Sequence, residues 1–257
     1  MLSKNKIKLV KSLDNPKYRR QEQLFVVEGE KLVNELFQSK LTPYLLFATK
    51  SWIDSQHKNF KNIKCQTEII SEDELKKISF LKTPPPVMCL VKLPDYKFVP
   101  SELNKKLSLA LDTVQDPGNL GTIIRIADWF GIENIICSSA TVDAFNPKVV
   151  QSAMGGLFRV KVHYVDLIDA LKQFRKLNTP IFGAMLDGIN IYGSELTESG
   201  IIVMGNESKG ISTEITQFID HKIYIPKYPE SKPEAESLNV ANATAIICSE
   251  FRRRLIK

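Results

Sequence analysis

The sequence has few of the residues that build metal centres and disulfide frameworks. Its four cysteines, Cys65, Cys89, Cys137 and Cys248, lie far apart without a Cys-x-x-Cys pair, and its three histidines are equally scattered. Structural zinc sites need closely spaced ligands, and small disulfide-stapled domains need a denser cysteine pattern. We therefore expect no metal and no disulfide framework, as in a protein of the reducing cytoplasm.

Long apolar runs are also missing. No stretch approaches the roughly 20 apolar residues of a membrane-spanning helix, and no apolar run of signal-peptide length follows Lys11. We expect an intracellular, cytoplasmic protein that makes no use of a membrane.

Two common nucleotide-binding signatures are absent as well. The segment GNESKGIS (205–212) superficially resembles the phosphate-binding loop GxxxxGK[ST], but Ile211 stands where the lysine is required. No GxGxxG follows any predicted strand. The first absence excludes a P-loop nucleoside triphosphatase, and the second disfavours a dinucleotide-binding domain.

What is present is a globular composition with an uneven charge distribution. The chain of 257 residues is 43% hydrophobic and 25% charged, with a net charge of +6. Residues 1–95 hold 17 Lys and Arg against 11 Asp and Glu, whereas residues 96–257 hold 18 of each. The first twenty residues contain one acid, Asp14, against Lys4, Lys6, Lys8, Lys11, Lys17, Arg19 and Arg20. This basic arm favours binding to a polyanion; a solvated, frayed terminus is the alternative interpretation.

Strands and helices are predicted to alternate along the whole chain. Periodicity places strands at 24–27, 44–48, 63–70, 87–93, 107–114, 134–138, 160–165, 181–185, 201–205 and 222–226, and helices at 28–39, 71–81, 119–130, 166–177 and 238–254. Such alternation predicts an α/β fold, with a parallel sheet in the C-terminal half. We expect a small α/β domain at 1–95, a linker at 96–106 and a second domain at 107–257.

Three segments of the second half carry chemically informative residues. In DPGNLGTIIRIADWFG (116–131), Asn119 is a candidate helix cap and Arg125 lies at the flank of an amphipathic helix, where a plain surface arginine is the simpler interpretation. In IIVMGNESKGIS (201–212), two glycines bracket Asn206 to Lys209 and let the backbone approach a ligand. In SLNVANATAIICSEF (237–251), Ser237 or Asn239 can cap a helix rich in small residues, which is either a core helix or one shared with a second subunit.

Together these segments resemble the three signature motifs of the SpoU (TrmH-like) RNA methyltransferases of the SPOUT superfamily. Asn119, Gly121 and Arg125 match the first motif, Gly205, Asn206, Glu207 and Gly210 the second, and Ile225, Pro226, Ser237, Leu238 and Asn239 the third. VVQSAMGGLFRVKV (149–162) is similar to a further family segment, and RRQEQLFVVEGEKLVNEL (19–36) to the family's N-terminal substrate-binding domain. The third motif departs from the family pattern, because Lys227 replaces a methionine and the loop that follows is longer.

The resemblance implies a trefoil-knotted domain that binds S-adenosylmethionine, without a metal, and acts as a homodimer. It implies that the donor contacts Met204, Gly205, Asn206, Gly210, Ile225, Pro226, Ser237, Leu238 and Asn239. It assigns catalysis to Arg125, supported by Asn119, Glu207 and Asn239. The family role of Arg125 is to act on the ribose 2′-hydroxyl; since a guanidinium stays protonated, a clamp on the adjacent phosphate is the alternative.

The expected activity is 2′-O-methylation of a ribose in structured RNA, with ribosomal RNA preferred and transfer RNA the alternative. The basic N-terminal residues are expected to contact the RNA. Two other interpretations remain open: an RNA-binding relative that has lost the donor through its altered third motif, and a base-methylating member of the superfamily, which the Asn119 and Arg125 pair disfavours.

Overall fold

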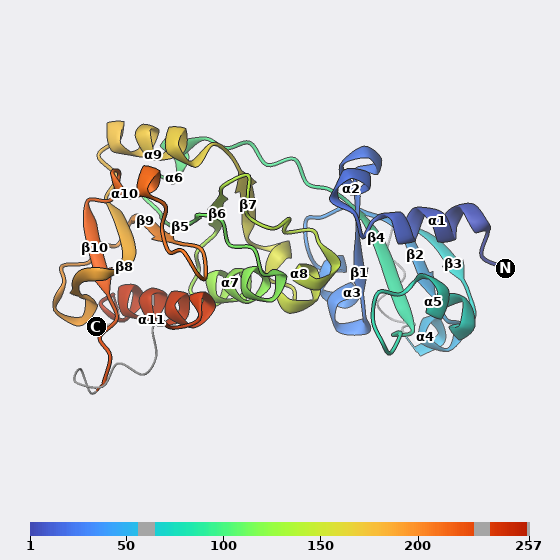
Figure 1. Cartoon of the computed structure of the whole chain (residues 1–257). Helices are drawn as coiled ribbons and strands as arrows, with labels where there is room; N and C mark the ends of the chain where they lie inside the picture. Colours follow the sequence, from blue (N-terminus) through green and yellow to red (C-terminus); the bar gives the residue numbers. More distant parts are fainter. Residues whose placement is uncertain (56–64, 229–236, 256–257) are drawn as a thin grey trace. The chain divides into compact units, whose positions relative to one another are not determined.

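The computed structural model describes residues 1–55, 65–228 and 237–255, and the chain divides into two compact units (Figure 1). Unit 1 consists of residues 1–95 and 143–158, and unit 2 consists of residues 96–142 and 159–257. These boundaries differ from the expected ones in two places. The expected linker 96–106 belongs to unit 2, where Leu103 enters the core. Residues 143–158, which were expected in the second domain, belong to unit 1.

Unit 1 is built on a four-stranded sheet. Its strands are β1 (Leu24–Glu28), β2 (Pro43–Ala48), β3 (Gln66–Ile69) and β4 (Val87–Lys92), in the order β1-β4-β2-β3. Its helices are α1 (Lys4–Ser12), α2 (Pro16–Glu22), α3 (Glu30–Phe37), α4 (Lys50–Ser55), α5 (Glu72–Ile78) and α8 (Pro147–Ser152), with a 3-10 turn η2 (Gly156–Phe158). Strand β4 is antiparallel to β1 and β2, while β2 and β3 are parallel. The predicted strands at 24–27, 44–48 and 87–93 are confirmed; residues 63 and 64 of the strand at 63–70 lie outside the described residues.

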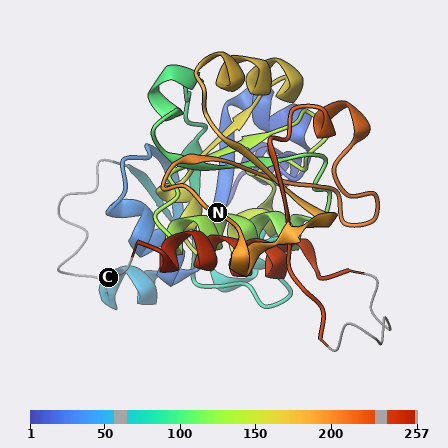
Figure 2. The same ribbon diagram turned by 90° about the vertical axis from the view of Figure 1, so that its left-hand side faces the viewer.

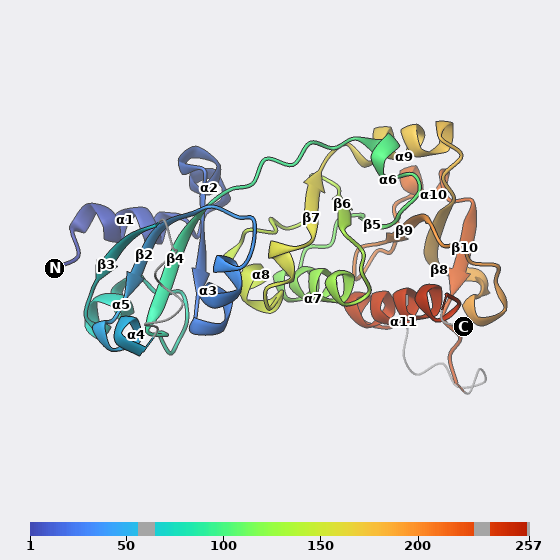
Figure 3. The same cartoon turned by 180° about the vertical axis from the view of Figure 1, so that it is seen from behind.

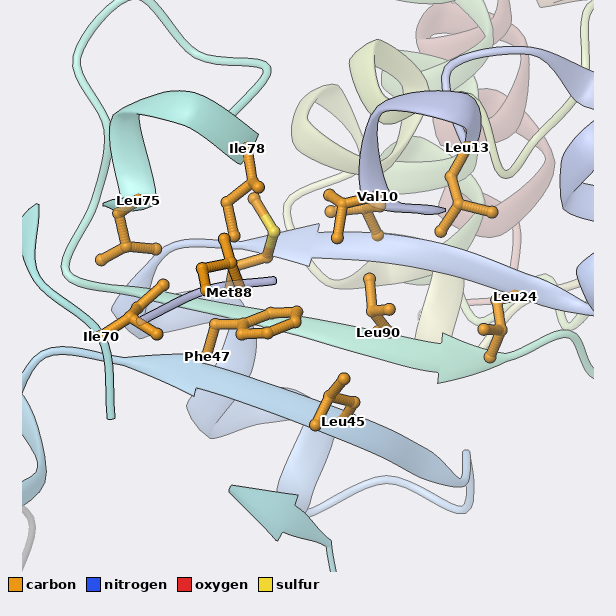
Figure 4. Packing of buried hydrophobic residues seen from close by; sticks show 12 residues of the cluster. Val10, Leu13, Leu24, Leu45, Phe47, Ile70, Leu75, Ile78, Met88 and Leu90 are labelled. Carbon is orange, nitrogen blue, oxygen red and sulfur yellow. The ribbon is translucent and has the colours of Figure 1, made fainter. Parts of the chain in front are cut away.

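The core of unit 1 lies between this sheet and the helices α1 and α5. Figure 4 shows Val10 and Leu13 from the N-terminal segment packed with Leu75 and Ile78 over Phe47, Met88 and Leu90 of the strands. Val10, Leu13 and Ile78 are completely buried. Burial of a large aliphatic side chain contributes about 1.5–3 kcal/mol, so the N-terminal segment is an integral part of this fold.

The alternative interpretation of a solvated, frayed terminus is therefore wrong. Residues 4–22 form α1 and α2, each with a capped N-terminus: the Ser3 hydroxyl accepts from the Lys6 N–H, and the Asn15 side chain accepts from the Lys17 N–H. Proline at the first position of α2 is also favourable, since the missing N–H would have no helical partner. Ile7, Val10 and Leu13 recur at a spacing of three residues and form an apolar face of α1. A count of charged residues does not detect this spacing.

Residues 143–158 are held to unit 1 by packing and by hydrogen bonds. The Phe145 ring lies 4.9 Å from that of Phe25, and the Gln151 Nε2 donates to the Glu28 carbonyl oxygen at 2.8 Å. The guanidinium of Arg19, only 1% exposed, donates from Nη2 to Asp143 at 2.7 Å and from Nη1 to the Leu13 carbonyl at 2.6 Å. This arginine was expected to contact RNA; its burial gives it a structural role instead.

Unit 2 is built on a six-stranded sheet in which every neighbouring pair of strands is parallel. The strands are β5 (Leu107–Leu111), β6 (Asn134–Cys137), β7 (Lys161–Tyr164), β8 (Ile181–Asn190), β9 (Gly200–Met204) and β10 (His221–Tyr224), in the order β10-β8-β9-β5-β6-β7. The helices are α6 (Pro100–Leu103), α7 (Pro117–Trp129), α9 (Leu167–Lys176), α10 (Thr213–Thr216) and α11 (Val240–Arg253), with a 3-10 turn η3 (Ile191–Gly193). The predicted α/β class and parallel sheet are confirmed.

Helices cover both faces of this sheet (Figures 1 and 3). On one face, Leu171 and Phe174 of α9 pack with α6, α10 and the buried side chains Ala110, Ile136 and Val203. On the other face, α7 and α11 lie side by side, as Figure 2 also shows. Their N-terminal ends meet at the carboxyl end of the sheet, because Asn239 contacts Asn119. The threading of a trefoil knot stays a prediction.

None of the helices in the described ranges is long and apolar enough to cross a membrane.

A buried histidine on β7 makes the stability of unit 2 depend on pH. His163 is 4% exposed, its Nε2 donates to the Asn134 Oδ1 at 3.1 Å, and its ring lies 5.6 Å from that of Phe98. Burial lowers the pKa of His163 below the ordinary 6.5, and the charge of Lys161 lowers it further.

We predict that unit 2 loses stability as the pH falls below about 6.5, because the unfolded chain binds a proton that the folded histidine rejects. The slope contributed by one group is at most about 1.4 kcal/mol per pH unit. Thermal unfolding of the wild type and His163→Gln between pH 5 and 8 measures it. The glutamine variant, which keeps a donor for Asn134, should show a flatter decline below pH 6.5; equal declines in both proteins would contradict the assignment.

Candidate active site

A cavity of about 710 Å³ opens at the carboxyl ends of β8, β9 and β10. In parallel α/β sheets this edge is where ligands bind, and the volume is in the range of small-molecule sites. Its walls are formed by Ala184 to Leu186, Met204 to Gly210, Ile223 to Tyr228, Ser237, Leu238, Val240, Ala243 and Ile247. The cavity therefore combines an apolar floor with one backbone-rich loop.

The structure gathers nearly all the residues expected to bind the donor around this cavity. Those on its wall are Met204, Gly205, Asn206, Gly210, Ile225, Pro226, Ser237 and Leu238. Asn239, the remaining one, is the N-cap of α11, and its Oδ1 accepts from the Ala241 N–H at 2.9 Å. Lys227 and Tyr228 also line the cavity, while most of the unusual loop 227–236, from residue 229 onward, lies outside the described residues.

Sequence reasoning missed the wall contributed by β8. The register of β8 against β10 shifts between Lys222, opposite Gly183, and Ile223, opposite Ile189. The residues between Gly183 and Ile189 consequently bulge out of the ladder, and Ala184, Met185 and Leu186 reach the cavity. The strand was expected to end at residue 185, because GAMLDGIN has no alternating pattern that would have extended it. Val240, Ala243 and Ile247 were expected to lie in a helix rich in small residues, but their place on the cavity wall was not predicted.

The loop after β9 is closed by its own backbone. Asn206 and Gly210 exchange two backbone hydrogen bonds of 2.9 Å, and the Asn206 Oδ1 accepts from the N–H groups of Ser208 and Lys209. A Cβ at Gly205 would lie 2.1 Å from the Gly210 carbonyl carbon. Any side chain at Gly205 would thus open the loop, so the glycine keeps the cavity wall in place.

Asn119 joins the three motif segments. Its Nδ2 donates to the Glu207 Oε1 at 3.0 Å, and its Oδ1 accepts from the Asn239 Nδ2 at 2.9 Å. The expectation that Asn119 caps the helix is wrong: α7 begins at Pro117, and the Asp116 Oδ1 accepts from the Asn119 N–H at 2.8 Å. Because Asp116 supplies the cap, the Asn119 amide is free for the other two segments.

Glu207 is the ionised carboxylate that accepts several hydrogen bonds of the same network. Burial would raise the pKa of its carboxyl, but hydrogen bonds from the Asn119 amide and from the N–H groups of Asp116 and Gln115 lower it below the ordinary value. The acceptor distances are 3.3 Å to the Asp116 nitrogen and 3.5 Å to the Gln115 nitrogen. The carboxylate therefore holds the start of α7 against the loop after β9.

A strained residue connects β5 to this network. Thr113 has a φ of 61°, a conformation that a β-branched residue rarely adopts. Its carbonyl accepts from the Asn206 Nδ2 at 2.8 Å, and its N–H donates to the Ser138 hydroxyl at 2.9 Å. Asp112 accepts from the Ser212 N–H at 2.8 Å. Strain of this kind persists only where the surroundings over-determine it, as is common at functional sites.

Arg125 lies apart from the network. Its side chain is exposed on α7, and within the described ranges it makes no hydrogen bond or ion pair with Asn119, Glu207 or Asn239. It does not line the cavity either. Arg125 shares its exposed stripe with Thr122 and with Trp129, which is 84% exposed. Its catalytic role and its positioning by the three polar residues stay predictions.

The cations expected to contact RNA divide into free and engaged groups. Lys4, Lys8, Lys17 and Arg20 are exposed. Lys6 pairs with Glu68, and the Lys11 Nζ donates to the Ser79 carbonyl at 2.7 Å and lies over the Phe80 ring. Lys4, Lys8, Lys17 and Arg20 are therefore the cations best suited to contact a phosphate backbone. Within the described residues no cluster of three metal-ligating side chains occurs.

Comparisons with known proteins match both halves of the chain to described families. The SpoU rRNA Methylase family matches residues 106–249, and the MRM3-like substrate binding domain matches residues 4–89. A 23S rRNA (guanosine(2553)-2′-O)-methyltransferase of Bacillus subtilis is 31% identical, over 96% of each chain.

Solved structures give the same result. A TrmH-family protein from Porphyromonas gingivalis, described as an RNA methyltransferase, aligns with a TM-score of 0.88 at 41% identity over 99% of both chains. An AdoMet-bound rRNA methyltransferase from Sinorhizobium meliloti aligns with a TM-score of 0.86 at 25% identity, covering 100% of this chain and 97% of that one. With its three motifs joined through Asn119 beside a donor-sized cavity, the chain belongs to the SpoU rRNA methylase family.

Proposed function

We propose that this protein transfers a methyl group from S-adenosylmethionine to the 2′-hydroxyl of a ribose in ribosomal RNA. The observation that carries the proposal is the network in which Asn119 binds Glu207 and Asn239 at the edge of the cavity. It unites the three motifs of a family whose relatives include ribosomal RNA 2′-O-methyltransferases.

The cavity suits the donor in size and in chemistry. Apolar side chains such as Ile223, Leu238 and Val240 can pack against an adenine, while the loop 205–210 offers backbone groups and the charged residues Glu207 and Lys209. When bound, S-adenosylmethionine supplies a methyl group already activated by a positively charged sulfur, so no metal is required.

The residues of the chain then have to position the acceptor. Asn119, Glu207 and Asn239 fix the ends of α7 and α11 and the cavity loop relative to one another, since each amide or carboxylate bridges two segments. Arg125 has five N–H donors and no acceptor, and its guanidinium stays protonated. We assign it to clamp the ribose oxygen and the neighbouring phosphate, because charge-assisted bidentate bonds are what arginine forms with phosphates. The hydroxyl proton then passes to water as the ribose oxygen gains the methyl group and the bond from that group to the donor sulfur breaks.

Arg125→Ala should lower methyl transfer by about 100-fold, the scale of losing alignment between nucleophile and methyl group. The measurement is incorporation of labelled methyl groups into ribosomal RNA from cells that lack this gene. Donor affinity, measured by calorimetry, should be unchanged, because Arg125 does not line the cavity.

The matched control is Arg175→Ala, which removes another exposed arginine of unit 2 from α9. Both variants should fold alike, and only Arg125→Ala should lose transfer. Undiminished methyl transfer by Arg125→Ala would contradict the catalytic assignment of Arg125.

The RNA class follows from the relatives and from unit 1. The B. subtilis relative is named for a 23S ribosomal RNA position, and residues 4–89 match a substrate-binding domain. Transfer RNA is the second candidate. Mapping 2′-O-methyl groups in both RNA classes, with and without the gene, distinguishes them. A cytoplasmic location, where bacterial ribosomes are assembled, stays a prediction that belongs to this proposal.

Exposed cations of unit 1 should set the salt dependence of RNA binding. Replacing Lys4, Lys8, Lys17 and Arg20 together by Gln should reduce the magnitude of the negative slope of log K against log salt by up to about 3.6, since each lost phosphate contact removes about 0.7–0.9. Deleting residues 1–20 is not an equivalent test, because Val10 and Leu13 belong to the core. Filter binding at several salt concentrations measures the slope. Lys172→Gln with Lys176→Gln on α9 serves as the comparison, and an unchanged slope in the quadruple variant would rule out this surface.

We also propose a homodimer formed through α7 and α11. Trp129 projects from the exposed stripe of α7 with 84% of its surface accessible, beside a helix that carries Ala243 and Ala245 at half-buried positions. Tryptophan is enriched among the few residues that carry most of the binding energy at protein interfaces.

Trp129→Glu should weaken the dimer by about 30-fold or more, the effect of losing an interface residue worth about 2 kcal/mol. Sedimentation equilibrium measures the dissociation constant. Leu177→Glu, an exposed apolar position at the end of α9, should leave it unchanged. If the wild type is a monomer at micromolar concentration, or if the two variants behave alike, the interface lies elsewhere or does not exist.

A non-enzymatic RNA-binding protein is the competing function, suggested by Lys227 and the long loop of the third motif. The cavity keeps Ile225, Pro226, Ser237 and Leu238 on its wall, which favours a functional donor site. Calorimetry with millimolar S-adenosylmethionine decides, because absence of binding would favour the competing function.

A further inference from the structure

Part of the cavity wall belongs to a stretch of β8 that the sheet itself does not hold. Ala184 to Leu186 line the cavity. In the described part of the chain, β8 pairs with β9 only through residues 181–183, and with β10 only before residue 184 and after residue 188. Residues 184–188 therefore have no ladder partner on either side. A segment without ladder hydrogen bonds opens more easily than the strands beside it, so this wall needs other contacts to keep its shape.

The first such contact is a close approach of two backbones at Gly188. A Cβ at Gly188 would lie 2.7 Å from the carbonyl carbon of Ile223 and 2.8 Å from its nitrogen. Glycine inside a strand is typical of such an approach, and Ile223 itself lines the cavity. The ion pair of Asp187 with Lys222 lies next to this contact but is exposed, and exposed pairs contribute little. The end of the unpaired stretch is thus held mainly by packing against the backbone of β10.

The second contact is made by Arg254 at the end of α11. Its Nη2 donates to the carbonyl oxygens of Ile191 and Tyr192, at 3.1 and 3.2 Å. Its Nη1 donates to the carbonyl oxygen of Ser194. These three residues belong to the turn η3 and its C-cap, directly after β8. The Nε of Arg254 donates at 3.0 Å to Glu250, which is only 4% exposed, so a buried carboxylate orients the guanidinium toward the chain that leaves β8.

The helix that carries Arg254 also forms another part of the cavity wall. Val240, Ala243 and Ile247 line the cavity, and Glu250 follows Ile247 by about one turn of α11. The wall residues and the guanidinium are thus parts of one continuous helix. Because Arg254 binds the chain that follows β8, it ties the wall formed by α11 to the wall formed by β8.

We propose that Gly188 and Arg254 are positioning residues that hold the β8 wall of the cavity, and that donor affinity depends on this wall being held. The inference rests on the proposed function, which identifies the donor as the ligand. Neither residue is among those that line the cavity, so each acts through the wall. A site that is ordered before binding costs less free energy to occupy than one that the ligand must order. Loss of either contact should therefore weaken donor binding while unit 2 stays folded.

The first test compares Arg254→Ala with Arg253→Ala in the full-length protein. Arg253 is the matched control: it donates to the same Glu250 carboxylate at 2.8 Å and, among the described residues, to no carbonyl of residues 191–194. In calorimetry, Arg254→Ala should raise the Kd for S-adenosylmethionine by about 3- to 30-fold, the range for residues that act on a site through others. Arg253→Ala should bind the donor as the wild type does. At saturating donor, both variants should keep the wild-type KM for RNA, which a general loss of structure would change.

The second test perturbs the other contact by adding one methyl group. Gly188→Ala should also raise the Kd for S-adenosylmethionine, because its Cβ pushes β8 away from the backbone of Ile223. Gly193→Ala in the turn η3 is the matched control, since a Cβ there would meet no atom of the described structure within 4 Å. This control should keep the wild-type Kd. If Gly188→Ala does not fold, the comparison of Arg254→Ala with Arg253→Ala decides alone.

Hydrogen exchange measures the wall without the donor. The amides of residues 184–190 should exchange faster in Arg254→Ala and Gly188→Ala than in the two controls, while those of β9 stay protected. Unchanged exchange at residues 184–190, loss of protection throughout unit 2 or an unchanged donor Kd would each overturn the proposal. If the wild type binds no S-adenosylmethionine, the proposed function fails, and the exchange rates still decide whether Gly188 and Arg254 hold the wall.

Discussion

The side-chain amide of Asn119 is the interaction on which the arrangement of the cavity edge depends. An amide offers one acceptor and one donor group, and here its oxygen binds Asn239 while its nitrogen binds Glu207. Aspartate would lose the donor and repel Glu207, and leucine would leave a half-buried carboxylate without one of its partners, which is costly. The start of α7, the loop after β9 and the start of α11 are therefore fixed together by a group that few other residues could replace.

Close approach of the backbone is the second constraint, and it depends on the first. The loop after β9 turns back on itself so tightly that a Cβ at Gly205 would overlap the Gly210 carbonyl carbon. The same turn presents Asn206 to the strained Thr113 and Glu207 to the start of α7. A loop that was free to open would lose both contacts. Glycine thus supplies the shape, while the side-chain hydrogen bonds select that shape from the many that glycine permits.

Sequence patterns predicted most elements and placed part of the cavity wall among the motif residues, for physical reasons that can be named. Buried parallel strands such as Leu107–Leu111 and Gly200–Met204 are continuous apolar runs, and motif residues at their carboxyl ends meet at one edge of a sheet. What the patterns could not show depends on contacts between distant residues. The burial of Arg19 requires Asp143, 124 positions away, and the β8 bulge at Ala184 to Gly188 requires the register of β10. Asn119 was misread as a cap because Asp116, three residues earlier, satisfies the same local rule.

Folding also determines how the basic N-terminal residues are presented to a partner. Lys4, Lys8 and Lys11 follow one another at spacings of four and three residues, so α1 places them along one face while Val10 and Leu13 enter the core. A flexible arm would lose conformational freedom on binding RNA, whereas a helix anchored by its apolar side has already lost it during folding. Lys11 is an exception among these lysines, since its ammonium donates to the Ser79 carbonyl. As proposed, the exposed lysines would therefore offer RNA a pre-ordered surface, because packing of Val10 and Leu13 in the core of unit 1 already stabilises the helical segment that carries them.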